Sequence, residues 1–283
     1  MRHLLLLLML FLPVILLSSG CVSSGGSVYG TGMEITALET KLSKVYSGES
    51  VGFSMRVKNT GSFDAGGKVT LSIGDWQCQP QDEEDFEPLI APDEERGTTG
   101  GEGTFRWTCT APQINEGMTV PYEARGDVRY DYRSVTSNSV MLVPTEELIA
   151  LRDAGQSLPT QLVSASHSPV SVSILVEGPI RMMSEENSIE FPVGITIENT
   201  GGGVVDASKV DLKVEGFGGL TGKDCDYSSM HLWRGTSQKI TCTMSATNVD
   251  SMTEGRIVAT LTYGYTVSKT VGIEVAGTSA AFR

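Results

Sequence analysis

Five cysteines are the side chains of this chain with the clearest capacity for covalent chemistry. Cys21 follows an apolar segment near the N-terminus, and the others lie far downstream: Cys78, Cys109, Cys225 and Cys242. They contain no Cys-x-x-Cys pair, and His167 and His231 do not lie at ligand spacing, so we expect no metal site. In an exported chain the four downstream cysteines are candidates for two disulfides, for which the sequence by itself allows three pairings.

A run of acidic residues between Cys78 and Cys109 could collect a hard cation such as Ca²⁺. It comprises Asp82, Glu83, Glu84, Asp85, Glu87, Asp93, Glu94 and Glu95. The run lacks the spaced Asp-x-Asp-x-Asp pattern of a calcium loop, so we expect residues 79–103 to form a long solvated loop. Another short motif, Arg125-Gly-Asp127, spells an adhesion tripeptide, but it leads into an expected strand and is common by chance.

Two pairs of tyrosines alternate along two expected strands, so that each pair projects to one face: Tyr130, Tyr132, Tyr263 and Tyr265. Such a pair could form a stacking platform for a sugar or a peptide. The alternative, which we favour, is a buried structural role like that of the tyrosine that closes a corner in sandwich folds. No nucleophile elbow, phosphate-binding glycine loop or opposed acid pair is present, so we expect no catalytic residue, no cofactor and no enzyme.

An internal repeat organises the chain. Apolar residues alternate over 51–57 and again over 191–197, and both stretches run into Asn-Thr-Gly, at residues 59–61 and 199–201. Alternation of this kind predicts a strand with one buried face, and Asn-Thr-Gly ends it in a turn. The spacing from Cys109 to its tyrosine pair equals that from Cys242, which indicates a tandem duplication. The repeat therefore favours the pairing Cys78–Cys109 and Cys225–Cys242.

The expected fold class is all-β, with two tandem Ig-like antiparallel sandwiches at residues 33–143 and 170–277 and a tail at 278–283. Short strands with frequent turn signals, and no regular alternation with helices, support that prediction. Residues 144–169 are expected to hold a short helix over 144–155, capped by Thr145, and then a linker.

The N-terminal residues predict export. Residues 4–17 are apolar apart from Pro13, follow Arg2, and are too short for a membrane span. Residues 1–21 thus form a signal segment whose end resembles the lipobox of lipoproteins, with Ser18 where leucine is more usual. That resemblance implies a lipidated Cys21 on the outer face of the cell membrane. An ordinary cleaved signal and an uncleaved anchor are the alternatives, and residues 22–32, rich in Ser and Gly, form a tether.

Each repeat also resembles the CARDB family of bacterial and archaeal surface proteins. The matching residues are Gly48 to Ser50, Val57 to Gly61, and the Thr-Cys approach to the late strand. The family's usual Asp and Asn-Asn ending is replaced here by the tyrosine pairs. The resemblance implies an adhesive or spacer module of the cell exterior.

The formal net charge of −13 argues against a nucleic-acid partner, because phosphates require clustered lysine and arginine. Our hypothesis is a membrane-tethered surface lipoprotein with two disulfide-bonded sandwiches, which acts as an interaction or structural module towards an envelope protein or polymer. The alternatives are a carbohydrate-binding accessory module that uses the tyrosine faces, and an accessory subunit of an envelope complex.

Overall fold

The computed structural model describes residues 31–81, 83–183, 188–230, 232, 237–247 and 249–278, without the side chains of 207–209. The predicted signal segment 1–21 with its Cys21 anchor lies outside the described residues. So do the predicted tether and tail, apart from residues 31, 32 and 278. No helix in the described part of the chain is long and apolar enough to cross a membrane.

The first of two sandwich lobes, called lobe 1, contains a four-stranded sheet built from the first copy of the repeat. Its order is β1 (Met33–Thr40), β3 (Ser50–Asn59), β7 (Glu102–Thr110) and β5 (Gln77–Gln79). The expected alternation is confirmed in β3, where every second residue from Val51 to Val57 is at most 2% exposed. This sheet forms one face of the lobe 1 core.

Lobe 2 contains the equivalent four-stranded sheet of the second copy. Its order is β10 (Val170–Leu175), β12 (Ser188–Asn199), β15 (Ser237–Thr247) and β14 (Leu220–Lys223). The alternation is again confirmed, because Phe191, Val193, Ile195 and Ile197 are all buried. The two copies thus build the same half of a sandwich from matching segments.

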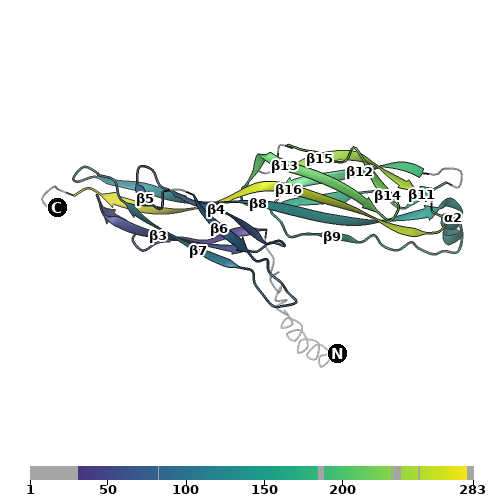
Figure 1. Cartoon of the computed structure of the whole chain (residues 1–283), viewed down its shortest axis with the longest axis horizontal. Helices are drawn as coiled ribbons and strands as arrows, with labels where there is room; N and C mark the ends of the chain where they lie inside the picture. Colours follow the sequence, from purple (N-terminus) through teal and green to yellow (C-terminus); the bar gives the residue numbers. More distant parts are fainter. Residues whose placement is uncertain are drawn as a thin grey trace, which may run out of the picture.

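A single long sheet supplies the second face of both lobes. Its main path is β13 (Val204–Phe217), β16 (Thr253–Ala276), β8 (Thr119–Pro144), β4 (Ala65–Ser72) and β6 (Glu84–Leu89). Three short strands pair beside this path, namely β2 (Lys44–Tyr46), β9 (Val163–Ala165) and β11 (Ile180–Met182). Figure 1 shows β8 and β16 passing from one lobe into the other.

The strands β8 and β16 form a central ribbon that joins the lobes. They pair antiparallel without interruption, from Leu142 opposite Thr253 to Thr119 opposite Ala276. Each strand begins in the lobe of its own copy and ends in the other lobe. There, the end of β16 pairs with β2 of lobe 1, and the end of β8 pairs with β11 of lobe 2. Each lobe is therefore completed by the last strand of the other copy.

This exchange differs from the consecutive layout that we expected from the sequence. The structure confirms an all-β sandwich architecture but does not confirm two consecutive Ig-like domains at 33–143 and 170–277. A last strand that returned to its own lobe would need a hairpin turn after Tyr130. The stretch from Arg129 to Val135 contains no glycine, proline or asparagine, which disfavours a two-residue hairpin in β8. The equivalent stretch of β16 contains Gly264 and also continues as strand, so in both copies the continuous pairing of β8 with β16 takes the place of a hairpin.

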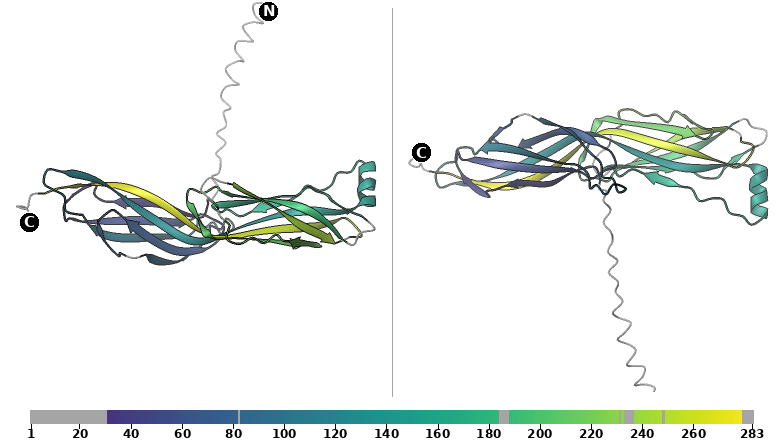
Figure 2. Two further views of the ribbon diagram at one scale, coloured as in Figure 1. Left: turned by 90° about the horizontal axis from the view of Figure 1, so that it is seen from above. Right: turned by 60° about the horizontal axis from the view of Figure 1, so that its bottom comes forward.

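The segment between β8 and β10 holds one helix, α2 (Thr145–Asp153), as expected. The predicted cap is wrong, because Pro144 occupies the N-cap and the Thr145 hydroxyl instead donates to the carbonyl of Met182 over 3.0 Å. The expected linker is also partly ordered as strand, since β9 pairs with β8. Figure 2 shows α2 at the far end of lobe 2, and the end of β16 at the opposite end of the molecule.

The exchange predicts how the protein behaves when it is cut between its two copies. A protease recognition sequence inserted after Gly155, in an exposed turn with open space around it, is expected to be tolerated. After cleavage the two fragments should still elute together at the mass of the intact chain, because the ribbon pairs them along its whole length. Light scattering coupled to gel filtration measures this. Fragments that separate without denaturant would contradict the exchange.

Candidate functional site

The four tyrosines predicted from the sequence meet at the joint between the lobes. Tyr130 lies opposite Tyr265, and Tyr132 lies opposite Tyr263, in the middle of the central ribbon. Their rings form a closed square of edge-to-face contacts, with centroid separations of 5.7, 5.9, 6.2 and 6.4 Å around it. Contacts of this geometry are favourable beyond the area they bury.

Each tyrosine hydroxyl binds backbone near the joint, and the two copies do so in equivalent ways. Tyr130 accepts from the N–H of Met33 at the start of β1, and Tyr263 accepts from that of Val170 at the start of β10. Tyr132 accepts from the N–H of Phe63, just after the first Asn-Thr-Gly. The fourth hydroxyl, that of Tyr265, accepts from the N–H of Gly203, just after the second Asn-Thr-Gly. The tyrosines thus hold the first strand and the Asn-Thr-Gly turn of each lobe against the ribbon.

The Asn-Thr-Gly motif is shaped to fit these tyrosines. The Asn59 side-chain amide donates to the carbonyls of Phe63 and Leu89, both over 2.8 Å, while Asn199 Oδ1 accepts from the Tyr265 hydroxyl over 2.9 Å. A Cβ placed on Gly61 would lie 2.1 Å from the Tyr132 hydroxyl, and one on Gly201 would lie 2.4 Å from that of Tyr265. Glycine is therefore required where the turn meets the ring.

The tyrosines are not a binding platform, which corrects one of the two interpretations left open by the sequence. Their exposed fractions are between 1% and 5%, so no sugar or peptide can stack on them. Burial raises the pKa of the Tyr130, Tyr132 and Tyr263 hydroxyls, and hydrogen bonds from Met33 and Phe63 to the first two act in the opposite direction. These three phenols remain protonated at neutral pH. The favoured structural interpretation agrees with this burial.

A stripe of buried polar side chains on β8, which was not predicted from the sequence, completes lobe 2. Ser134, Thr136 and Asn138 point into the core and donate to the carbonyls of Val170, Val172 and Ile174 on the edge of β10. They satisfy backbone groups that would otherwise be buried without partners. The sequence held one signal for this stripe. The three polar residues are spaced by two, at inward positions of the strand where apolar residues are expected.

Lobe 1 uses a different side chain at the equivalent place on β16. Lys269 Nζ donates to the carbonyls of Ile35 and Thr36 on β1, over 3.2 and 3.0 Å. A charged hydrogen bond reaching the strand from the surface thus replaces the neutral buried stripe of lobe 2. The two exchanged strand ends are consequently not interchangeable.

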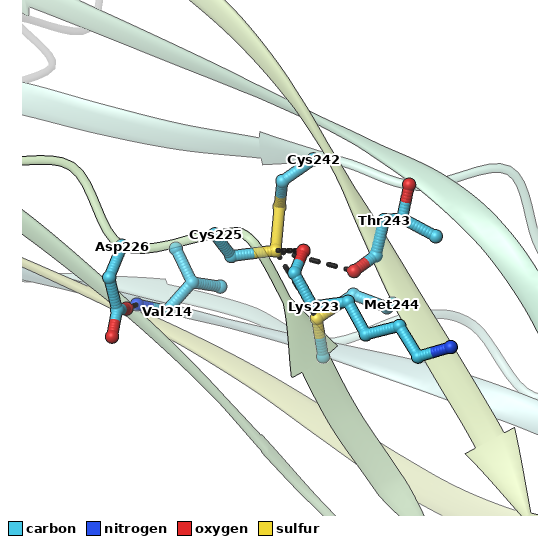
Figure 3. Close-up of a disulfide and its surroundings, with 7 residues drawn as sticks. All are labelled: Val214, Lys223, Cys225, Asp226, Cys242, Thr243 and Met244. Carbon is cyan, nitrogen blue, oxygen red and sulfur yellow. Dashed lines mark hydrogen bonds between the residues drawn. A yellow bond between two sulfur atoms is a disulfide. The ribbon is translucent and has the colours of Figure 1, made fainter.

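The structure contains both disulfides in the pairing that the repeat favours. Cys78 bonds Cys109 between directly opposed residues of β5 and β7, and Cys225 bonds Cys242 in lobe 2. Figure 3 shows the second bridge beside Met244, with Asp226 accepting from the N–H of Val214 next to it. All four cysteines are buried, which indicates structural bridges.

The acidic segment is more ordered than the solvated loop that we expected. Residues Glu84–Leu89 form the edge strand β6, which pairs with β4. Glu83 forms ion pairs with Lys68 and Arg129, so basic side chains of the protein balance part of the segment's negative charge. Among the described residues, no group of three or more His, Cys, Asp or Glu side chains is placed to hold a metal ion. In the tripeptide motif, the side chains of Arg125 and Asp127 bind each other on β8.

A surface cleft of about 910 Å³ lies beside the joint, on the outer side of the ribbon. Its walls combine Asp64 of the loop after the first Asn-Thr-Gly, the outward residues Asp131 and Asp211 of the long sheet, and the edges of Tyr132 and Tyr263. The Arg133 guanidinium lies 4.1 Å from the centroid of the Phe63 ring and so occupies that aromatic face. The cleft is open to solvent, and its lining is partly polar and partly apolar.

Comparison with known proteins leaves the chain without an assigned family. No family model matches it, and no curated protein matches it. Among solved structures, a mutant of Salmonella alpha-2-macroglobulin is similar, with 11% identity, a TM-score of 0.27, and coverage of 88% of this chain and 16% of that one. The collagen adhesin of S. aureus has 11% identity, a TM-score of 0.12, and coverage of 88% and 94%. Similarities this weak carry no argument, so the CARDB-like resemblance stays a prediction.

The joint generates a prediction about two adjacent glycines. Replacing Gly201 with alanine should lower the free energy of unfolding by about 1–3 kcal/mol, because its Cβ would collide with the Tyr265 hydroxyl and Pro169. Replacing Gly202, which has no atom within 4 Å of an added Cβ, should change it by less than about 0.5 kcal/mol. Urea denaturation of the two variants measures both values.

A double-mutant cycle then tests the cause. Tyr265→Phe removes the colliding hydroxyl, so the cost of Gly201→Ala should be smaller in that background. Additive effects, or an equal cost at Gly202, would show that the turn does not depend on the tyrosine.

Proposed function

We propose that this chain is an exported lipoprotein, tethered through a lipidated Cys21 to the outer face of the cell membrane. The observation that carries the proposal is the use of the cysteines. Four of the five are consumed by two disulfides, which form and persist in oxidising compartments. The remaining one, Cys21, directly follows an apolar export-like segment.

In this proposal each lobe is an Ig-like sandwich whose last strand comes from the other copy. The order β1-β3-β7-β5 corresponds to strands A-B-E-D of that fold, and β4, β8 and β16 correspond to C, F and G in lobe 1. Lobe 2 has the same order, with the roles of β8 and β16 reversed. The match in strand order supports the Ig-like classification.

The two lobes act as a non-catalytic interaction or structural module. A ribbon continuous through both lobes couples them mechanically, because bending the joint would break ladder hydrogen bonds and the tyrosine square together. Such a module holds two loop-bearing ends at a set separation and presents them to an envelope protein or polymer. Sandwich folds serve many functions, so the identity of that partner must come from experiment.

Mass spectrometry of the mature N-terminus tests the anchor. We expect the first residue of the membrane-extracted protein to be Cys21 carrying an acyl modification. The matched control is Cys21→Ala, which leaves both disulfides intact and should release the protein from the membrane fraction. An unmodified Cys21, or a mature chain that starts elsewhere, would refute the lipoprotein.

A further inference from the structure

One edge of lobe 2 lacks charge in a chain that is otherwise strongly acidic. Residues 154–176 contain no Asp, Glu, Lys or Arg, although the whole chain has 34 acidic and 21 basic residues. This segment runs from the end of α2 through β9 and then forms β10 at the edge of its sheet. We call residues 154–176 the uncharged edge.

The uncharged edge also carries the most exposed large apolar side chains of the described residues. Leu175 is 74% exposed, Leu162 is 70% exposed and Val163 is 63% exposed, ahead of Tyr46 at 57%. The strands that carry them are neighbours, because Val163 of β9 pairs with Asn138, whose side-chain amide donates to the carbonyl of Ile174 on β10. Exposed apolar groups that gather in this way mark a surface that contacts a protein or a membrane.

The uncharged edge reaches the joint between the lobes, next to Gly32 near the start of the described chain. Pro169 packs on Gly32, whose carbonyl accepts from the N–H of Thr60 over 2.8 Å, so residue 32 is fixed at the joint. The backbone N–H of the neighbouring His167 donates to the Ser62 hydroxyl over 2.8 Å. Residues 22–31 then separate this point from Cys21, and ten residues reach at most about 35 Å. A tether of that length keeps the uncharged edge within reach of the membrane.

We infer that the uncharged edge rests on the lipid surface to which the chain is tethered, an inference that depends on the proposed lipid anchor. Leu162, Val163 and Leu175 enter the interface, where no charged neighbour on the edge has to lose water. The molecule is then held at its joint and lies along the membrane, and both ends stay near the surface. The acidic remainder is repelled by anionic headgroups, which favours this edge over the others.

Fluorescence quenching on vesicles tests this contact. The full-length acylated protein is bound to phosphatidylcholine vesicles whose acyl chains carry bromine, a quencher of tryptophan. Leu162→Trp and Leu175→Trp place the reporter on the uncharged edge, and both positions are exposed enough to accept it. We expect the emission of these two added tryptophans to fall by roughly half, because interfacial side chains lie several ångströms into the headgroup and acyl boundary.

The control is Leu42→Trp, at a position of lobe 1 that is 42% exposed, and the unsubstituted protein supplies the background emission of the native tryptophans. Emission from the control should fall much less. Equal quenching at positions 42, 162 and 175 on vesicle-bound protein would overturn the inference and leave the edge free for a protein partner. Protein that fails to float with the vesicles would refute the tether and, with it, this contact.

Discussion

The structure depends on one constraint, the uninterrupted pairing of β8 with β16. Each of these strands runs on past its tyrosine pair and leaves the lobe of its own copy, so its second half needs a partner in the other lobe. The duplicated copy provides that partner in the same chain, at the high effective concentration of a covalent link. Neither lobe has a complete second sheet without the other copy. The two lobes are therefore one folding unit in terms of strand pairing.

The repeated motifs acquire their meaning from this ribbon. Asn-Thr-Gly ends the strand that each lobe is built around, and its glycine leaves room for a tyrosine at the centre of the ribbon. The most recognisable residues of the sequence thus lie at the joint, where the two copies meet, and the two asparagines and the four tyrosines are buried there. The surfaces left for contacts outside the molecule are the segments in which the copies differ, such as β6 and, for the membrane, the uncharged edge.

Local patterns in the sequence predicted much of the fold. The alternation over 51–57 and 191–197 predicted both central strands, and the repeat predicted the disulfide pairing. The exchange could not be predicted in this way, because alternation shows which face of a strand is buried but not which strand lies beside it. One signal pointed to it, namely the polar residues Ser134, Thr136 and Asn138 at inward positions of β8. The strand β6 was missed because its acidic residues resemble a loop.

Zero-length cross-linking tests the exchange most directly. Lys44 of β2 lies beside Glu274 of β16 in the parallel pairing, 230 positions apart in the sequence, and both residues are exposed. Carbodiimide treatment of the monomeric protein, followed by peptide mapping, should recover a peptide that joins Lys44 to Glu274. If the last strand of each copy returned to its own lobe, Lys44 would instead lie near the end of β8. A link from Lys44 to Glu146 or Glu147 would contradict the exchange.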